Sequence, residues 1–364
     1  MLFPYTHVPH PIEKMQAFID FIFFEVWCQA PVSGPFSLDL FNPNPELHEV
    51  MTAFHYDDSR GAEFFSGHVE RIYGLFAVLS AGQIDQFRQR YRANNDIESV
   101  CANDPAASVM RYADFPGELE DVRDQLASFF KRVYSYLDVA ALKAKTGAID
   151  DHYRAFMAAN QADVCPFCGI ADLLGEYHSK RDAYDHYLPK ALYPFNSANF
   201  KNLVPACHHC NSSYKTSKDP AYTPKDPAGG AHRRAAFYPY AEAPYAIQLR
   251  VTLLQSDIEK LTPADLDLQF GPDDLSEKIE TWRNVYGIDE RYKAKFCGKQ
   301  NGGRYWLDQM LGEWRYLGRD PSDYMAALAW HTQCSPYADC NFLKKAFLDG
   351  CHATGIFNAA QLVS

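Results

Sequence analysis

Apolar residues recur at helical intervals through most of the first 150 residues. The pattern predicts helices over residues 11–29, 61–80, 83–91 and 118–146. The last of these has a broad apolar face and is followed by Gly147, a residue that commonly ends a helix. Proline-rich stretches at 31–45 and 105–116 separate the helices. We therefore expect residues 1–150 to form a helical domain, and no motif in it indicates a chemical role.

After residue 161 the spacing of apolar residues changes from helical to irregular or alternating, and later becomes helical again. Residues 148–161 predict a helix that leads into a loop-rich segment, and 211–218 predict a short helix that ends before Pro220. Alternating apolar residues at 245–254 and 265–270 predict two paired strands. Helical spacing then returns at 277–292, 303–317, 321–333 and 342–354.

The expected fold is therefore predominantly α with a small central α+β module. The module occupies residues 151–235, between the helical domain 1–150 and a C-terminal region 236–364 of short strands followed by helices. A hydrophobic fraction of 47% in 364 residues is enough for buried cores, and two or three compact units are expected at this length. The most apolar N-terminal stretch is interrupted by Asp20 and Glu25, so it predicts neither a signal peptide nor a membrane helix. We expect a cytoplasmic protein.

The charge is distributed unevenly. The whole chain carries −11, which argues against indiscriminate coating of nucleic acid. Residues 180–234 contain nine basic and four acidic residues, and this window is therefore positive. A positive region on a negative chain is typical of a local phosphate contact, although an ordinary solvated face would look the same in sequence.

Two Cys-x-x-Cys pairs, Cys165/Cys168 and Cys207/Cys210, enclose the first half of this window. Four thiolates at paired spacing favour a structural zinc ion over a redox pair or unconnected thiols. Zinc binding contributes about 10–16 kcal/mol in small peptides, enough to order a segment with little regular structure. His208 and His209, within the second pair, remain alternative ligands.

The other six cysteines are scattered through the chain. We interpret them as buried thiols that pack as small hydrophobic side chains. They are Cys28, Cys101, Cys297, Cys334, Cys340 and Cys351. A second metal site formed by His331, Cys334 and Cys340 is an alternative, although the spacing of these residues does not match the paired Cys-x-x-Cys pattern of zinc sites.

The segment around the paired cysteines contains four short motifs in this order along the chain: CPFC, DHYLP, NLVPAC and CHHCNSSYK. In this order they resemble the HNH (His-Asn-His) endonucleases, also called ββα-metal or His-Me finger nucleases, across about residues 165–218. The resemblance implies a treble-clef zinc site, with Asp185 as a metal ligand and His186 as the general base. It also implies that Asn202 holds the active-site loop and that Asn211 is a second metal ligand. Because Asn211 stands where many members have histidine, the chain resembles the HNN variant.

The chemistry of these residues agrees with the resemblance. Phosphodiester hydrolysis needs a base for the attacking water and positive charge near the phosphate. Histidine titrates close to neutral pH, and carboxylate and amide oxygens suit Mg²⁺ or Mn²⁺. One difficulty is that Asp185 and His186 are adjacent, so on a regular strand their side chains would point to opposite faces.

The candidate phosphate contacts are Lys190, Lys201, Lys215 and Lys218, with Arg233 and Arg234 as further candidates. Of these we favour Lys215, which shares a predicted helix with Asn211. We expect a metal-dependent nuclease that acts on DNA, with RNA as an alternative substrate. By analogy with the family it would be an anti-phage defence effector with a protein partner such as an ATPase. The competing hypothesis is a non-catalytic zinc module that binds nucleic acid or protein.

Overall fold

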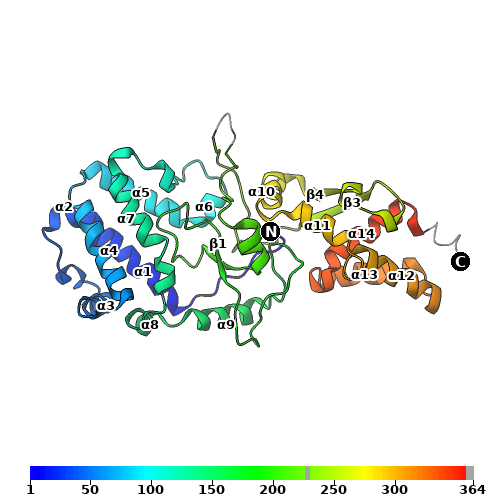
Figure 1. The fold of residues 1–364 in the computed structure, drawn as a ribbon, viewed down its shortest axis with the longest axis horizontal. Coiled ribbons are helices and arrows are strands. Elements are labelled where there is room, and N and C mark those ends of the chain that lie inside the picture. The colour runs from blue at the N-terminus through cyan, green and yellow to red at the C-terminus, as the bar shows by residue number, and fades with distance from the viewer. Residues whose placement is uncertain (226–229, 358–364) are drawn as a thin grey trace.

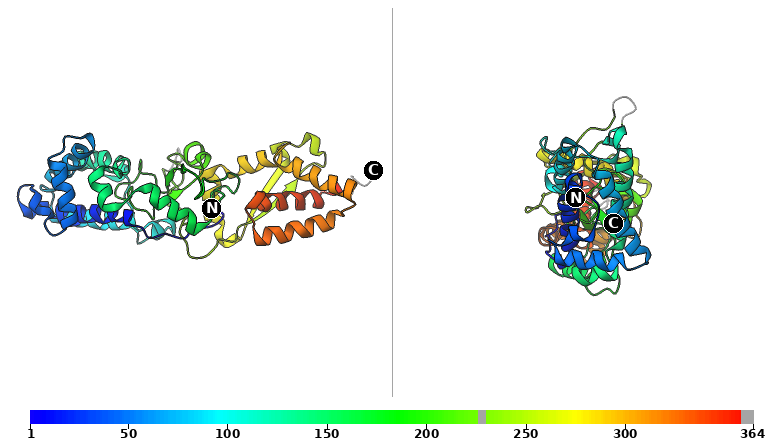
Figure 2. Two further views of the ribbon diagram at one scale, coloured as in Figure 1. Left: turned by 90° about the horizontal axis from the view of Figure 1, so that it is seen from below. Right: turned by 90° about the vertical axis from the view of Figure 1, so that its left-hand side faces the viewer.

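The computed structural model describes residues 1–225 and 230–357, which form an elongated molecule with three parts in line (Figures 1 and 2). Helices of the N-terminal part lie at one end and those of the C-terminal part at the other, with a hairpin and its loops between them. The described residues contain two small two-stranded sheets, and helices dominate the rest. The predominantly helical fold predicted from the sequence is confirmed.

Nine α-helices make up the N-terminal part. They are α1 (Lys14–Phe21), α2 (Ala30–Ser33), α3 (Pro45–His55), α4 (Arg60–Phe76), α5 (Ala81–Asn95), α6 (Ile97–Cys101), α7 (Glu120–Phe130), α8 (Ala140–Thr146) and α9 (Ile149–Asn160). Their core is aromatic: Trp27 packs on Phe76, Phe129 and Phe130, and its indole N–H donates to the carbonyl of Val69 at 2.9 Å. Such rings bury large apolar areas, and the indole donor is satisfied inside the core.

One helix prediction in this part was wrong, and one of the longer helices was not predicted. Residues 118–146 form α7 and α8 rather than one helix, because the chain turns at Val133–Tyr136 and brings Tyr134 against the central part. Tertiary packing overrides the helical spacing there. Helix α3 was missed, although Asn44 accepts a hydrogen bond from the backbone N–H of Leu47 at its start and Pro45 occupies its first position.

The central part contains the antiparallel strands β1 (Tyr184–His186) and β2 (Leu203–Pro205), with Asp185 opposite Val204. A helical segment, His209–Lys215, follows β2. Its turn is wide, since the backbone N–H of Thr216 donates to the carbonyl of Asn211, five residues earlier, at 2.9 Å. Wide turns of this kind occur often at functional sites.

The C-terminal part begins with the antiparallel pair β3 (Gln248–Leu253) and β4 (Leu266–Gly271), which confirms both predicted strands. The helices that follow are α10 (Ser276–Tyr286), α11 (Ile288–Phe296), α12 (Gly303–Leu317), α13 (Pro321–Cys334) and α14 (Asn341–Ala353). The predicted helix 277–292 is divided at Gly287, whose φ is +60°. A Cβ atom there would lie 2.5 Å from the ring of Tyr214, so only glycine allows this close approach.

The central part is joined to both neighbours through buried contacts. Phe195, on the loop between β1 and β2, inserts its ring among Phe23 and Phe130 of the N-terminal core, with ring centroids 5.4 Å apart in each pair. On the other side Trp282 of α10 donates its indole N–H to the carbonyl of Phe167 at 2.7 Å. Among the residues described, no helix combines the length and apolar character needed to cross a membrane.

Candidate functional site

The four cysteines of the paired motifs converge in the central part. All four are buried, and their Sγ atoms lie within 4.8 Å of one another, with 4.0 Å between those of Cys168 and Cys207. Zinc binds thiolate at about 2.3 Å, which in a tetrahedron puts the sulfurs about 3.8 Å apart. The arrangement could therefore hold a metal ion such as zinc, as predicted.

The C-terminal helices supply the surroundings of this cluster. Arg291 of α11 donates from Nη1 to the Sγ of Cys210 at 3.1 Å. Burial acts to lower the pKa of Arg291, but the neighbouring thiolates outweigh it and raise that pKa above its usual value. Tyr292 donates its hydroxyl to the carbonyl of Cys168 at 3.0 Å. Four thiolates on a divalent ion leave a net charge of −2, which the Arg291 guanidinium partly balances.

The alternative ligands do not join a metal-ligand cluster. Across residues 1–225 and 230–357, the four-cysteine group is the sole cluster of three or more cysteine, histidine or acidic ligands. The hypothesis of a second metal at His331, Cys334 and Cys340 is therefore wrong for this conformation, and Cys334 is exposed on the surface. His208 and His209 are also exposed and lie outside the cluster.

Asp185 and Lys215 form a buried ion pair. Lys215 Nζ donates to Asp185 Oδ1 at 2.9 Å and to the main-chain carbonyl of His186 at 2.8 Å, and the two side chains are 0% and 3% exposed. Burial raises the pKa of Asp185, and the Lys215 ammonium opposes that shift. Our preference for Lys215 as a phosphate contact was wrong, because its ammonium is enclosed and already paired.

His186 lies beside this pair, half-buried, with its ring edge-to-face against Tyr134 at 4.9 Å between centroids. Its Nε2 lies 3.1 Å from the carbonyl of Ser197. Since a carbonyl only accepts hydrogen bonds, Nε2 carries the proton and Nδ1 is the basic nitrogen of the neutral ring. Burial, followed by the charges of Lys190 and Lys215, lowers the pKa of His186 to about 3, so the ring is neutral near pH 7.

The two adjacent residues do face opposite sides of β1. Asp185 points to the helical segment that carries Lys215, whereas His186 points to Tyr134 of the N-terminal part. The strand alternation expected from the sequence is therefore present. A phosphate reached by both residues would have to sit at the end of the strand, where β1 gives way to the loop that begins at Tyr187.

Asn202 holds that loop to the strand. Its Oδ1 accepts from the backbone N–H of Leu188 at 2.7 Å, and its Nδ2 donates to the carbonyls of Leu188 and Asn196 at 3.0 and 3.3 Å. The side chain is fully buried and satisfied at both ends. These bonds tie the loop after β1 to the residue that precedes β2.

The end of α5 holds the same loop from the N-terminal side. Asn94 donates from Nδ2 to the carbonyl of Pro194 at 3.0 Å, while Asn196 donates back to the carbonyl of Asn94 at 3.2 Å. Asn199 bonds both the carbonyl and the side-chain oxygen of Asn95 at 3.1 Å. Because Ser197 lies within this braced stretch, α5 indirectly positions the carbonyl that orients His186.

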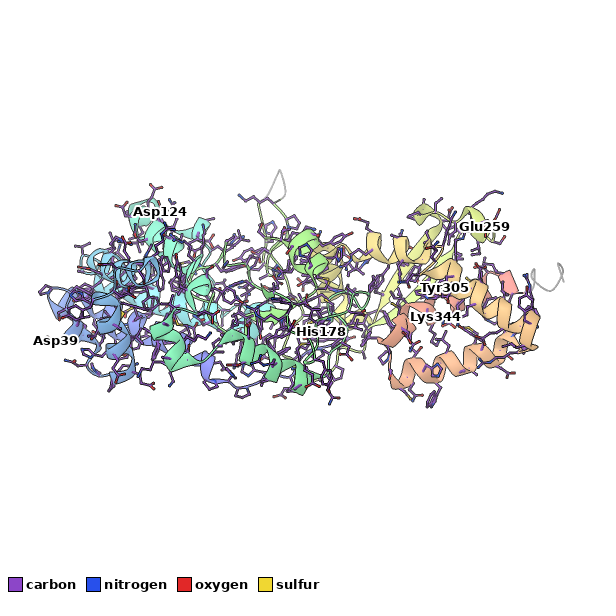
Figure 3. All side chains as sticks on the ribbon, turned by 60° about the horizontal axis from the view of Figure 1, so that its bottom comes forward. Asp39, Asp124, His178, Glu259, Tyr305 and Lys344 are labelled. Atoms are coloured by element: carbon purple, nitrogen blue, oxygen red, sulfur yellow. The ribbon has the colours of Figure 1, made fainter. Side chains whose placement is uncertain are left out.

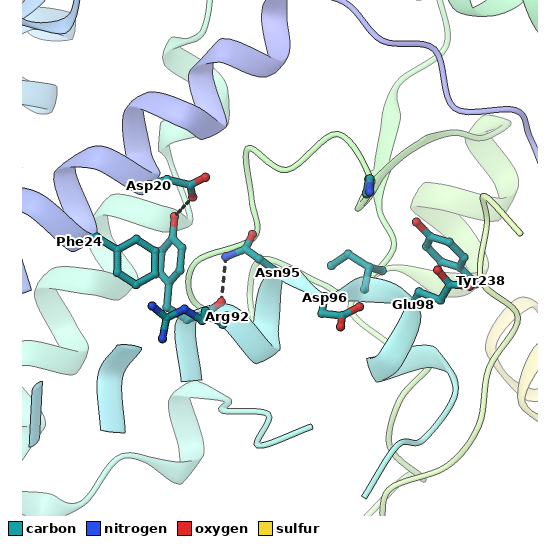
Figure 4. Close-up of a pocket in the computed structure, with 10 residues that line it drawn as sticks. Asp20, Phe24, Arg92, Asn95, Asp96, Glu98 and Tyr238 are labelled. Atoms are coloured by element: carbon teal, nitrogen blue, oxygen red, sulfur yellow. Dashed lines mark hydrogen bonds between the residues drawn. The ribbon is translucent and has the colours of Figure 1, made fainter. Parts of the chain in front are cut away.

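The remaining predicted residues are dispersed around the site. Asn211 is partly exposed on the helical segment that carries Lys215. Lys190 lies near His186, with its ammonium 5.5 Å from the centroid of Tyr134. Lys218 reaches the carbonyl of Val285 at the end of α10, at 3.4 Å. Lys201 instead lines a cavity of about 390 Å³ beside α5, bordered by Asp20, Asn95 and Asp96 (Figure 4).

The two further candidate arginines are engaged within the fold. Arg233 donates to the carbonyls of Ala107 and Val100 at 3.3 and 3.2 Å. Arg234 is buried and donates to the carbonyl of Asp219 at 2.7 Å. Arg233 thereby contacts the N-terminal part, and Arg234 also donates to Oδ1 of Asn284 in α10 at 3.3 Å. Because both guanidinium groups are used within the fold, the structure does not support either as a phosphate contact.

Sequence reasoning missed Tyr134 and the asparagines of α5, which meet the site only through the fold. It gave Arg291 no role in the site, because the contact of its guanidinium with Cys210 becomes evident only once the helices are placed. No family model, no curated protein and no solved structure matches this chain. The resemblance to HNH nucleases therefore rests on the sequence motifs alone.

Proposed function

We propose that this protein is a metal-dependent endonuclease of the HNH type, with a treble-clef zinc site, that hydrolyses phosphodiester bonds in DNA. The observation that carries the proposal is the geometry of His186. Its Nε2 is tied to the carbonyl of Ser197, which leaves Nδ1 as the basic atom, and its strand neighbour is a buried carboxylate. A purely structural zinc module needs neither feature.

The zinc cluster and the asparagine contacts give this arrangement its rigidity. Zinc on the four cysteines would fix the segment around Cys165 and the start of the helical segment that follows Cys207. Asn202 fixes the loop at Leu188, and α5 fixes it from the far side. A catalytic group held on both sides loses little entropy when substrate binds.

Asp185 and Asn211 are the candidate ligands of a catalytic Mg²⁺ or Mn²⁺. The donor set suits a hard cation, since Asp185 Oδ2 is buried without a hydrogen-bond partner among the described residues and Asn211 adds an amide. Lys215 occupies the other oxygen of Asp185, and it already supplies one positive charge there. When bound, the cation would supply charge stabilisation for the phosphate and the leaving oxygen.

The residues of the chain then have distinct roles. His186 accepts the proton of the attacking water at Nδ1, while the Ser197 carbonyl keeps its ring oriented. The negative phosphate would raise the pKa of His186 from its low value and make the ring a stronger base at the moment of attack. Lys190, whose ammonium lies 5.5 Å from the centroid of the Tyr134 ring that packs on His186, is the candidate for neutralising phosphate charge.

One observation favours the alternative, a zinc module that binds nucleic acid or protein without cleaving it. Asp185 is enclosed and already paired with Lys215, so its carboxylate has a partner within the fold without any cation. The two functions differ in their dependence on the cation. The alternative predicts binding that is indifferent to Mg²⁺ and to substitution of His186.

Incubation of the purified, zinc-containing protein with labelled DNA and with RNA of the same sequence tests the proposal. Separate reactions should contain Mg²⁺, Mn²⁺ or no added divalent cation. We expect cleavage of DNA in the first two and none in the third. Intact DNA under all three conditions, at protein concentrations that bind the strand, would refute the nuclease assignment.

A further inference from the structure

A second polar cavity, which we call the α9 cavity, lies between α9 and the loop of residues 175–183 that leads into β1. Its volume is about 410 Å³, and Arg154, His178, Lys180 and Arg181 contribute to its lining. Figure 3 shows His178 in the central part of the molecule, away from Tyr305 and Lys344 of the C-terminal part. None of the motifs in the sequence accounts for this cavity.

The charges of the α9 cavity favour an anion. Three of the lining residues are permanent cations, against one lining carboxylate, Asp150. Asp150 Oδ1 accepts from Nε of Arg181 at 2.6 Å, and its side chain is 68% exposed. Arg154 pairs with Asp151 on the outer face of α9, where solvent screens the pair strongly. Lys180 is exposed.

The α9 cavity lies on the same face of β1 as the candidate base. Tyr184 and His186 are two residues apart on the strand, so their side chains share a face. The guanidinium of Arg181 lies 5.8 Å from the ring centroid of Tyr184, and Tyr134 stands edge-on against His186. The ammonium of Lys190 lies 5.5 Å from the centroid of the Tyr134 ring. A line of cationic and aromatic groups therefore runs from the α9 cavity past His186.

We propose that the α9 cavity binds a backbone phosphate of the nucleic-acid strand whose nearby linkage is presented to His186. This inference rests on the proposed function and adds to it a binding site for the substrate strand. Arg181 and Lys180 contact the phosphate, Arg154 contributes from the rim, and Asp150 weakens binding because it competes for Arg181. Phosphate contacts position a strand without reading its sequence, so the site should be indifferent to base identity.

The test is binding of fluorescently labelled single-stranded DNA, and of RNA of the same sequence, to the full-length zinc-containing protein without added divalent cation. Anisotropy titrations over a range of salt concentrations give the slope of log affinity against log salt. Removal of one phosphate contact should reduce the magnitude of that slope by about 0.7. We expect this from K180A and from R154A, each of which changes an exposed side chain.

D150N provides the sharper test, because we expect it to tighten binding by releasing Arg181, and loss of folding cannot mimic a gain in affinity. K344A is the matched control: it removes a lysine of the C-terminal part that bonds Gln309, and it should leave the slope unchanged. Slopes that K180A and R154A leave at the parental value, together with a D150N affinity no tighter than that of the parent, overturn the inference. Equal slopes for DNA and RNA support a phosphate contact common to both strands, and a change confined to one strand type identifies that strand as the ligand.

Failure of this inference and failure of the proposed function can be told apart. If the variants change the slope as expected but the protein cleaves neither strand, the α9 cavity is a phosphate site and the nuclease assignment is wrong. If the parent cleaves DNA while all three variants bind and cleave as the parent does, the nuclease assignment holds and the strand follows another path.

Discussion

The buried pair of Asp185 and Lys215 allows a quantitative prediction. In K215M the ammonium is replaced by an apolar group of similar length, so Asp185 Oδ1 loses its partner and Oδ2 already has none among the described residues. Removing one member of a buried pair costs about 3–5 kcal/mol, because an uncompensated charge stays in the interior. The carbonyl of His186 also loses a donor, which costs about 1 kcal/mol more. We therefore expect K215M to lower the free energy of unfolding by about 4–6 kcal/mol.

The assay is urea unfolding of the zinc-containing protein near neutral pH, followed by tryptophan fluorescence. The double variant D185N/K215M removes both charges and should recover about 2–3 kcal/mol of the loss, a coupling typical of residues in direct contact. K201M is the matched control, since Lys201 is exposed and should change stability by less than about 0.5 kcal/mol. A K215M protein as stable as K201M would refute the interpretation of Lys215 as a desolvated partner of Asp185.

Three further predictions concern the surroundings of the site. R291Q removes the guanidinium that contacts Cys210, so it should increase the rate of zinc loss to a chelator by about 10- to 100-fold. A zinc-sensitive dye measures the release, and an unchanged rate would exclude the electrostatic role of Arg291. N202A deletes three buried hydrogen bonds and should cost about 2–4 kcal/mol in urea unfolding, whereas a loss below about 0.5 kcal/mol would show that the loop is held by other contacts. For His152, burial and then two nearby histidines lower the pKa to about 4, so between about pH 6.5 and pH 4 the unfolded chain binds a proton that the folded chain does not. As the pH falls from about 7 to about 5, His152 should therefore lower the free energy of unfolding by up to about 2 kcal/mol. The H152Q variant should show a flatter dependence of stability on pH, and parallel profiles for the two proteins would contradict this prediction.

The sequence predicted those features that depend on local spacing. The paired cysteines, the strands at 245–254 and 265–270, and the helices after residue 300 follow from residue type and period, and the structure contains the strands, the helices and the cysteine cluster. Helix ends were missed where another part of the fold intervenes. Gly287 divides a predicted helix because the ring of Tyr214, 73 residues earlier in the chain, packs against it.

The environment of the site could not be read from the sequence, because its partners come from distant segments. Lys215 was expected at a phosphate, and its burial against Asp185 becomes evident only when β1 and the helical segment His209–Lys215 are placed together. The contacts of Tyr134 with His186 and of Asn94 with the loop depend on how the N-terminal helices dock. Residues 1–150, which carried no recognisable motif, thus brace the candidate site.

The central claim is that His186 removes a proton from the attacking water, and single-turnover cleavage of labelled DNA by H186A tests it most directly. The comparison is with the parent protein at equal zinc content and saturating Mg²⁺. We predict a rate about 10²- to 10⁴-fold below the parent, with binding of the strand retained. Cleavage by H186A at the parental rate would contradict the account.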